Sequence, residues 1–474
     1  MPETDARLAR NGLVPLFALL VTLAAIYGPG IGHGFVKDDV VWVEANAVSS
    51  WEDVKELALR THGFYRPLVS ASFAVDRAAY DLWPLGYGIT NLGLLMLSTL
   101  ALVWLATGVG LTRPAAVAAA AVWALNFHGI NMAVLWLSGR TGLWLVLCAL
   151  IAAGFFVRRR WMLAGVAVLF AAFAKEEAVM LPVILCGWAL ILHAGPDGKG
   201  SRVAHVARAT WPAWLAIGIY LALRSGTNAM TPSTSPSFYS FTFAPLDVAR
   251  NVLEYLDRAG TFSVLVFALA CALAWRLPKV TDRTRRLAVA GAIWFAGAYA
   301  LTVCLPVRSS LYACLPSVGA ALVAGSVLQD LWITLNPKQS RRLLVVAVIT
   351  PIALLPVYWS RNTRWVEIAD LSRETFAVLH TAAGQAAANT PSGIIFEDDR
   401  ATRRSFENTY GNLLPVAVKL ATGREIPTAI EPPLPGEPNG SRSTALAEQT
   451  ERIIRIRLHN GHVSRVDAEP DVTR

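Results

Sequence analysis

The sequence predicts an all-α polytopic membrane protein of about eleven transmembrane helices, followed by a small extracytoplasmic α/β domain. Three observations lead to this prediction. Of the 474 residues, 54% are hydrophobic and only 16% are charged, whereas roughly 25% of the residues in a soluble domain are charged. The apolar residues form blocks, and about 20 residues of helix are enough to cross a bilayer. The basic residues lie mainly in the short connections between these blocks.

The formal net charge of the chain is +9, and membrane topology accounts for it. Lys and Arg accumulate in the cytoplasmic loops of membrane proteins. Arg7 and Arg10 precede the first apolar block, so the N-terminus is expected in the cytoplasm. The later basic clusters fall on the same side when the blocks are counted as spans. The charge therefore gives no reason to expect nucleic acid as a partner.

The first expected span, residues 13–30, lacks a small-residue cleavage site, which indicates a retained signal anchor. Residues 32–84 then form an outer loop, in which residues 51–59 space their apolar side chains like a surface helix. The later spans are expected at residues 86–106, 115–127, 143–157, 162–174, 179–192, 211–223, 262–275, 287–305, 311–331 and 343–358. Residues 1–358 are thus expected to form the membrane domain.

The composition changes at residue 359, where the apolar blocks stop and the density of charge rises. Residues 359–474 are therefore expected to form a soluble domain on the outer face. Residues 393–396 are typical of a buried strand, and residues 452–458 alternate as an edge strand does. The pattern does not identify what this domain does.

Two adjacent acids, Asp38 and Asp39, follow the first apolar block almost directly. Ionisable groups are costly at a membrane and commonly serve a function there. The pair is therefore the strongest candidate for a functional site. The alternative explanation is a solvated turn that caps a helix.

Further polar residues are expected at the outer ends of the spans, where a bundle would bring them near the acid pair. They are Tyr65, Arg66, Asn91, His128, Asn131, Arg140, Lys175, Glu176 and Arg308. Structural explanations are open for several of them. Arg66 is placed like an interfacial residue that extends its charge to water. Arg140 and Lys175 can mark span ends, Arg308 can anchor a loop, and His128 fits a span-end polar residue better than a metal ligand.

This set of residues suits the transfer of a sugar from a polyprenyl phosphate. A positioned carboxylate can act as a general base toward the hydroxyl of an acceptor. Arg and Lys stabilise the negative charge of the departing lipid phosphate, and Arg can bind two oxygens at once. A helical bundle also provides a groove, open to the bilayer, for the lipid tail. We therefore expect an enzyme with acids and cations at one height of the outer face.

The motifs resemble those of a known family. The segments concerned are Phe35–Asp39 with Asn46 after it, Tyr65–Leu68, His128–Asn131, Gly139–Arg140, Lys175–Glu176 with Pro182 beyond, and Arg308–Tyr312 with Pro316–Gly319 after it. Their order and spacing over about residues 13–330 are similar to the GT-C superfamily of membrane glycosyltransferases. Within it, they resemble bacterial relatives of the transmembrane-and-tetratricopeptide-repeat O-mannosyltransferases. The chain departs from the family pattern at Gly129, where Pro is usual, and in lacking a tetratricopeptide repeat.

The resemblance implies a polyprenyl-phosphate-linked sugar as donor and a protein or glycan acceptor on the outer face. It implies Asp38 as the base, with Asp39 assisting it, and the two acids as possible ligands of Mg²⁺ or Mn²⁺. The residues implied to bind the lipid phosphate are Tyr65, Arg66, Arg140, Lys175 and Arg308. Contacts with the sugar or the acceptor would come from His128, Asn131, Glu176 and Tyr312. Two carboxylates permit a divalent ion without establishing one, so the sequence makes no cofactor certain and leaves Mg²⁺ or Mn²⁺ open.

Two other classes of function stay open. A transporter or flippase for a lipid-linked saccharide would use the same cations to bind phosphate without bond cleavage. Transporters commonly carry inverted repeats and broken helices at mid-membrane, and the sequence shows neither. A non-catalytic membrane scaffold would bind a partner through its outer domain, and Asp38→Asn would then be silent. The Ala-rich composition favours a bacterial cytoplasmic membrane, with the site facing outward.

Overall fold

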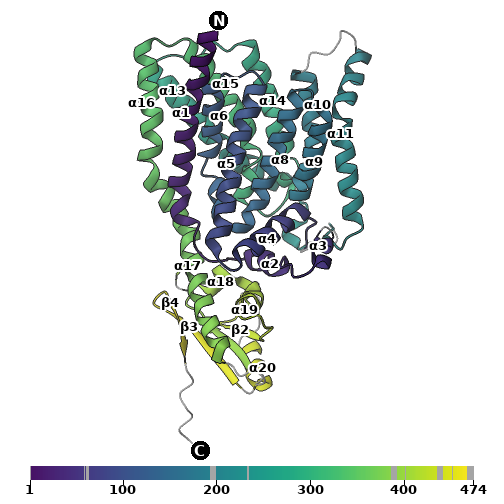
Figure 1. Ribbon diagram of the computed structural model, residues 1–474, viewed down its shortest axis with the longest axis vertical. Coiled ribbons are helices and arrows are strands. Elements are labelled where there is room, and N and C mark those ends of the chain that lie inside the picture. Colours follow the sequence, from purple (N-terminus) through teal and green to yellow (C-terminus); the bar gives the residue numbers. More distant parts are fainter. Residues whose placement is uncertain are drawn as a thin grey trace, which may run out of the picture.

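The computed structural model of the protein is a bundle of long helices with a smaller domain beyond one end (Figure 1). It describes the chain except residues 1, 58, 60–62, 193–198, 232–233, 386–391, 401, 435–440, 451 and 467–474. In this part of the chain, seven helices are long and apolar enough to cross a membrane. The protein is therefore a multi-pass helical membrane protein, as its composition predicts.

Each predicted span falls on helix. The helices are α1 (Pro2–Tyr27), α5 (Pro84–Gly108), α6 (Arg113–Ala124), α8 (Arg140–Val157), α9 (Trp161–Ala174), α10 (Leu181–Leu192), α11 (Lys199–Ser225), α13 (Phe262–Ala274), α14 (Asp282–Tyr299), α15 (Ser317–Ile333) and α16 (Pro337–Ala353). A further helix, α12 (Pro245–Leu256), leads through a short π-helical turn into α13. Because α6, α9, α10 and α14 are not among the seven candidate spans, the expected number of about eleven stays a prediction.

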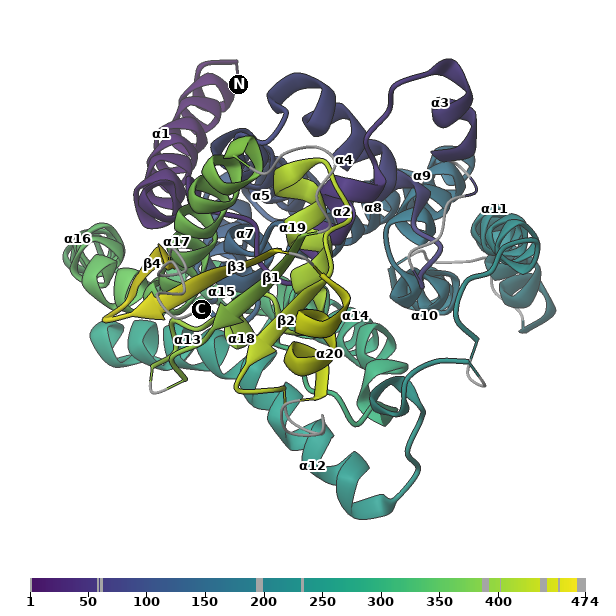
Figure 2. The same cartoon turned by 90° about the horizontal axis from the view of Figure 1, so that it is seen from below.

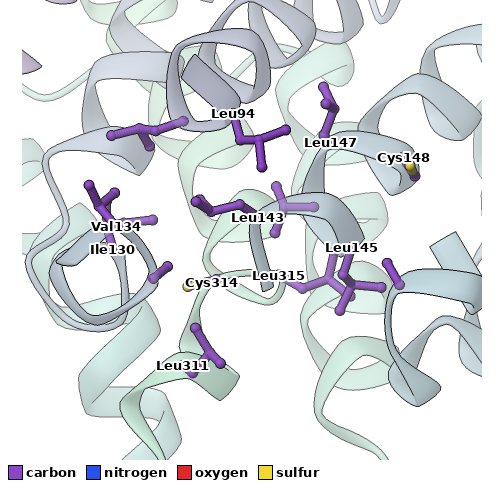
Figure 3. Close-up of a cluster of buried hydrophobic side chains, with 14 of the residues drawn as sticks. Leu94, Ile130, Val134, Leu143, Leu145, Leu147, Cys148, Leu311, Cys314 and Leu315 are labelled. Atoms are coloured by element: carbon purple, nitrogen blue, oxygen red, sulfur yellow. The ribbon is translucent and has the colours of Figure 1, made fainter. Parts of the chain in front are cut away.

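Helix α8 lies inside the bundle, and 78% of an 18-residue stretch within Leu137–Val157 is buried. Figure 3 shows leucines of α8 among side chains from α5, from α7 (Ile130–Leu135) and from the turns before α15. Small residues let these helices approach closely. A Cβ atom on Gly154 of α8 would lie only 2.0 Å from the ring of Trp104 on α5. Such contacts are typical of membrane bundles, where lipid provides no hydrophobic drive between helices.

The basic connections meet at the end of the bundle where the N-terminus lies (Figure 1). Arg283 donates to the carbonyl oxygen of Gly110 at 2.5 Å, and Arg276 donates to that of Thr334 at 2.8 Å. Connections that are distant in sequence thus share one face of the bundle. The C-terminal domain lies at the opposite end (Figure 1). This arrangement agrees with the expected topology, in which the basic end faces the cytoplasm.

The outer loop folds into three short helices below the bundle, α2 (Asp39–Ala45), α3 (Trp51–Leu57) and α4 (Pro67–Tyr80) (Figure 1). Helix α3 confirms the surface helix predicted at residues 51–59 as far as Leu57; residue 58 lies outside the described residues. Asp53 fixes its start by accepting hydrogen bonds from the backbone N–H groups of Ser49 and Ser50. Trp42 of α2 stacks on Phe73 of α4 with 5.6 Å between the ring centroids, so that the loop is a packed structure.

The C-terminal domain begins on a helix that continues from the bundle, because α17 (Leu355–Gln385) runs through the predicted boundary at residue 359. The sheet of the domain has the order β2-β1-β3-β4. Its strands are β1 (Ser392–Glu397), β2 (Thr428–Glu431), β3 (Arg452–His459) and β4 (His462–Val466), and its helices are α18 (Phe406–Thr409), α19 (Leu414–Thr422) and α20 (Ser441–Gln449). The domain therefore mixes helices and strands, as expected.

The buried strand predicted at residues 393–396 is confirmed by β1. The edge position predicted for residues 452–458 is wrong, because β3 pairs in parallel with β1 and antiparallel with β4. The alternation has another cause. One face of β3 packs into the core, and on the other Arg455 and Arg457 donate to Glu397.

The C-terminal domain packs directly against the outer loop, and Figure 2 shows α19 next to α2. The backbone N–H of Lys37 donates to the carbonyl oxygen of Thr409 at 2.7 Å. Lys419 Nζ lies 2.9 Å from a carboxylate oxygen of Glu44. The segment that carries the acid pair is therefore held by the domain on one side and by the bundle on the other.

Candidate active site

The turn before α2 separates the two acids of the pair. Lys37 has a φ of 51°, in the left-handed region that residues other than glycine rarely adopt. Helix α2 begins two residues later. Asp38 is exposed, whereas Asp39 is fully buried. Two neighbours in the chain thus have opposite surroundings and need separate explanations.

Asp39 ties the outer loop to the turn before α8. Its Oδ1 accepts hydrogen bonds from the backbone N–H of Ser138 at 2.7 Å and from Ser138 Oγ at 2.5 Å. Its Oδ2 accepts one from the backbone N–H of Val36 at 3.0 Å. Burial raises the pKa of Asp39 to about 7, although these hydrogen bonds act in the opposite direction. The carboxyl is closed to substrate, so this position gives Asp39 a structural role in place of the implied catalytic one.

The implied metal site does not fit these residues. Both oxygens of Asp39 already accept hydrogen bonds from the protein. Within the described part of the chain, no group of three or more His, Cys, Asp and Glu side chains is arranged to hold a metal ion. We therefore derive no step that involves Mg²⁺ or Mn²⁺.

Asp38 is the acid of the pair that a substrate can reach. Its side chain forms no cap hydrogen bond to α2, and among the described residues it has no ion-pair partner. Asp38 is exposed at the surface, but the protein around it removes part of the water from its carboxyl group, and this desolvation raises its pKa. The positive charges of Arg66 and Lys37 oppose the rise. A carboxylate with a raised pKa is a better proton acceptor. Asp38 therefore suits the role of a general base.

Local sequence explains how the neighbouring charges project from helix ends. Pro67 fits the first turn of α4 and keeps the residue before it out of the helix, so Arg66 has φ −135° and ψ 63°. Lys175 ends α9 in an extended conformation with φ −164°, and Glu176 opens the short turn Glu176–Met180. The side chains from these two ends meet at the outer face.

Arg66, Glu176 and Arg224 form the first charged group. Arg66 Nη2 lies 2.7 Å from Glu176 Oε2, and Arg66 Nε lies 3.2 Å from both carboxylate oxygens. Arg224 Nη1 lies 3.6 Å from Glu176 Oε1. Burial raises the pKa of Glu176, but the charge and hydrogen bonds of Arg66 outweigh it, so the pKa is lowered. An ionised Glu176 thus holds two guanidinium groups, and Arg66 exerts the largest charge effect on Asp38.

Lys175 and Glu177 form the second group. Lys175 Nζ lies 2.6 Å from Glu177 Oε1, and both side chains are nearly buried. The ammonium group also lies 4.6 Å from the centroid of the Tyr312 ring, close enough for a cation–π interaction. Glu177 acts electrostatically on Arg66 and on Tyr239, which places this pair beside the first group.

Arg308 belongs to a third group. Its Nε donates to Asn251 Oδ1 at 2.7 Å and lies 3.5 Å from Glu254 Oε2. Arg258 pairs with the same carboxylate. Tyr255 is within electrostatic reach of both Arg308 and Glu177, so the third group adjoins the second.

The three groups together carry an excess of positive charge. Among the described residues they hold five cations, Arg66, Arg224, Lys175, Arg258 and Arg308, and three carboxylates, Glu176, Glu177 and Glu254. Two positive charges are thus unmatched before Asp38 is considered. Partly buried charge of one sign attracts a ligand of the other sign, and guanidinium groups bind phosphate oxygens well.

Arg140 does not join these groups, which corrects its predicted role as a phosphate ligand. It is fully buried inside the bundle, and its Nη2 lies 2.7 Å from Asp76. It also donates to Asn91 Oδ1 at 3.0 Å and to Ser72 Oγ at 3.2 Å. With these partners, its guanidinium joins α4, α5 and α8. The side chain of Arg140 links these three helices, and because it is buried a lipid phosphate cannot reach it.

Tyr65 has a supporting position. The residue is buried, and its ring lies 6.2 Å from that of Phe173 and 5.9 Å from that of Tyr220. This packing anchors the segment in front of α4 and thereby orients the adjacent Arg66. Because the ring of Tyr65 is buried against these two rings, the structure gives no support to its predicted contact with the donor.

His128 and Asn131 lie toward the third group. His128 is half-buried; burial lowers its pKa, and Arg361 and Arg258 add to this effect. Asn131 Oδ1 accepts a hydrogen bond from the adjacent backbone N–H of Met132 at 2.8 Å. Between them, Gly129 has a φ of 93°, which proline cannot adopt. Proline therefore could not replace Gly129 in this backbone.

Four residues of the candidate site were not predicted from the sequence: Arg224, Tyr239, Glu254 and Arg258. Arg224 ends α11 at the outer face, and a cation there departs from the positive-inside pattern, so this departure was a usable signal. Tyr239 lies in a connection rich in Ser, Thr and Pro, and Glu254 lies on α12. Nothing in the local sequence distinguishes Tyr239 or Glu254.

The sequence matches no protein family and no curated protein. Two of the solved structures that it resembles are of ArnT from Cupriavidus metallidurans. The apo structure has 11% identity and a TM-score of 0.46, over 95% of this chain and 93% of that one. The structure bound to undecaprenyl phosphate has 11% identity and a TM-score of 0.44, over 93% of this chain and 92% of that one. A likeness of this degree does not indicate which residues act, or on what.

Proposed function

We propose that the protein is a membrane glycosyltransferase that moves a sugar from a polyprenyl-phosphate donor to an acceptor at the outer face. The observation that carries the proposal is the exposed carboxylate of Asp38 beside charged groups with surplus positive charge. Both lie where a membrane bundle meets the outer surface, which a lipid-linked phosphate reaches by diffusion in the bilayer. The resemblance of the motifs to GT-C enzymes supports the same activity.

Asp38 is the proposed general base. It accepts the proton of the acceptor hydroxyl while the oxygen of that hydroxyl bonds to the anomeric carbon of the sugar. The bond from this carbon to the phosphate oxygen breaks, and its electron pair leaves with the lipid phosphate. A base of this kind contributes a rate factor of about 10²–10⁴. The stereochemical outcome depends on which side of the sugar faces Asp38.

The proposed phosphate ligands are Arg66 and Arg224, with Lys175 and Arg308 adding positive charge. Glu176 holds Arg66 through Nε and Nη2, which leaves Nη1 for a phosphate oxygen. Preorganised cations of this kind stabilise charge that develops on a leaving group. Tyr312, against Lys175, is the proposed contact for the sugar.

A transporter of a lipid-linked saccharide is the second candidate, and Asp38 favours the enzyme over it. A carboxylate beside bound phosphate weakens the binding of that phosphate through charge repulsion. This carboxylate serves no purpose in a protein that only binds and releases the donor. An enzyme needs it as a proton acceptor.

The test is the consumption of labelled polyprenyl-phosphate sugars by membranes that contain the wild-type chain or Asp38→Asn. We expect the wild type to release polyprenyl phosphate from one donor, and the variant to do so about 10²–10⁴ times more slowly. Glu52→Gln is the matched control, because Glu52 is an exposed acid of the same loop that pairs with Lys55. Intact donors in every sample, or equal consumption by wild type and Asp38→Asn, would contradict the proposal.

The pH profile of the same assay provides an independent check. Because the pKa of Asp38 is raised, the base becomes protonated at a higher pH than an ordinary Asp does. We expect the rate to fall on the acid side through that raised pKa. A rate that is flat down to about pH 4, the usual pKa of Asp, would exclude Asp38 as the base.

A further inference from the structure

A cavity of about 430 Å³ lies at the basic end of the bundle, opposite the candidate active site. The C-terminal ends of α5, α8 and α10 and the first turns of α14 surround it. Its volume is within the range of about 300–1,000 Å³ that is usual for sites of small molecules. None of the residues considered for sugar transfer lines it.

Two arginines of α14 line this cavity. Arg283 Nη1 donates to the carbonyl oxygen of Gly110 at 2.5 Å, which fixes the guanidinium at the wall and leaves other N–H donors. Arg286 lies three residues further, on the same side of the helix. It is exposed and has no ion-pair partner in the described part of the chain. The neighbouring Arg285 differs, because it pairs with Asp282 at 3.4 Å and does not line the cavity.

The surroundings do not neutralise these charges. Arg158, at the end of α8, lies against Gly108 of the cavity wall and donates to the backbone carbonyls of Gly154 and Trp104. The nearest acid on α14, Asp282, is matched by Arg285. Asp330 is buried and accepts hydrogen bonds from Thr281 at the start of α14. Neither Asp282 nor Asp330 lines the cavity, so an anion there meets two guanidinium groups and no carboxylate among the described residues of the wall itself.

The other side chains in the wall are apolar, namely Val109, Val157, Leu192 and Leu287. They lie at the basic end of the bundle, near the ends of α5, α8 and α10 and in the first two turns of α14. Guanidinium groups next to apolar side chains match a ligand that carries a phosphate next to hydrocarbon. A free phosphate ion would leave the apolar part without a partner.

We infer that this cavity binds the phosphate headgroup of an anionic phospholipid, with Arg283 and Arg286 as its ligands. Basic pockets between transmembrane helices on the cytoplasmic side suit such headgroups, and the distribution of Lys and Arg places this end on that side. The bound lipid would connect α14 to the end of α5. The inference does not depend on the proposed sugar transfer.

Thermal unfolding of the full chain in neutral detergent tests the inference. We expect phosphatidylglycerol to raise the unfolding midpoint more than phosphatidylcholine does, and inorganic phosphate to have no comparable effect. Arg286→Gln should reduce the shift caused by phosphatidylglycerol by at least half, and Arg283→Gln combined with Arg286→Gln should abolish it. Arg285→Gln removes the same charge from the same helix outside the cavity and should keep the full shift. Native mass spectrometry should show one fewer bound phosphatidylglycerol in the double variant.

Three outcomes would overturn the inference. If Arg285→Gln lost as much of the shift as the cavity variants do, phosphatidylglycerol would be binding through the general positive charge of the surface. A full shift with inorganic phosphate alone would mean that the cavity takes a free anion. An undiminished shift in the double variant would place the lipid elsewhere. The unfolding midpoints without lipid show whether each variant is folded.

Discussion

At Asp39, burial and hydrogen bonding act on one carboxyl group in opposite directions. Burial raises its pKa, and the hydrogen bonds from Ser138 and Val36 lower it, with a result of about 7 against an ordinary 3.8. An acid with a raised pKa in the folded state binds its proton more tightly there than in the unfolded chain. The stability that this provides is fully present below pH 3.8 and is lost as the pH rises to about 7.

We expect the stability advantage of the wild type over Asp39→Asn to shrink as the pH rises from about 4 to about 7, by about 1.4 kcal/mol per pH unit at most. Above this window, Asp39→Asn is still expected to lower the free energy of unfolding by about 1–3 kcal/mol. The amide nitrogen of Asn cannot accept the hydrogen bond that the backbone N–H of Val36 donates to Asp39. Unfolding of both chains at a series of pH values measures the difference. A difference that stays constant, or grows with pH, would refute this account of Asp39.

At the scale of helices, small residues set the distance between α5 and α8. Gly154 lies where a Cβ atom would come within 2.0 Å of the ring of Trp104. The position of that ring is constrained, since it packs edge-on against Phe155 at 5.2 Å and has Arg158 over it at 4.2 Å. The contact therefore has little room to adjust, and overpacking is destabilising.

We expect Gly154→Ala to lower the free energy of unfolding by about 1–3 kcal/mol, seen as a lower unfolding midpoint in detergent. The control is Gly93→Ala on α5, where an added Cβ has no neighbour within 4 Å. That change should be neutral or stabilising, because Ala favours helix over Gly by about 1 kcal/mol. Equal effects of the two substitutions would show that close packing at Gly154 is not what matters.

At the scale of the whole molecule, the C-terminal domain and the bundle enclose the segment that carries Asp38. The backbone of Lys37 bonds to Thr409, and Lys419 of α19 pairs with Glu44 of α2. The same Lys419 also lies 2.9 Å from Glu425 within the domain. The position of Asp38 thus depends on how the C-terminal domain packs against the outer loop.

We expect Lys419→Glu to weaken the packing of the C-terminal domain against the outer loop, because it places a second carboxylate opposite Glu44. Backbone amides of residues 36–45 should then exchange hydrogen faster, and the rate of donor consumption should fall. Adding Glu44→Lys restores opposite charges and should recover both properties. Glu425→Gln, which removes only the partner within the domain, is the control. Unchanged exchange in Lys419→Glu would mean that the pair does not hold the domain against the outer loop.

Local sequence was enough to predict the class of the protein, a multi-pass helical membrane protein, and to name several residues of the candidate site. Apolar blocks and basic connections are properties of local composition, so they predict a membrane bundle with one basic end. A charged residue at a span end is equally visible in the sequence, and Asp38, Arg66 and Glu176 were proposed as site residues for this reason. The structure brings Arg66 and Glu176 into contact across 110 residues of chain.

The packing of distant segments determines which of these charged residues are exposed and which are buried. Asp38 and Asp39 are neighbours in sequence, and a turn exposes one and buries the other. Arg140 looked equivalent to Arg66 as a cation at a span end, yet the packing of α4 against α8 gives it Asp76 as a partner inside the bundle. Burial and ion pairing depend on side chains that come from distant parts of the chain, and local sequence does not contain that information.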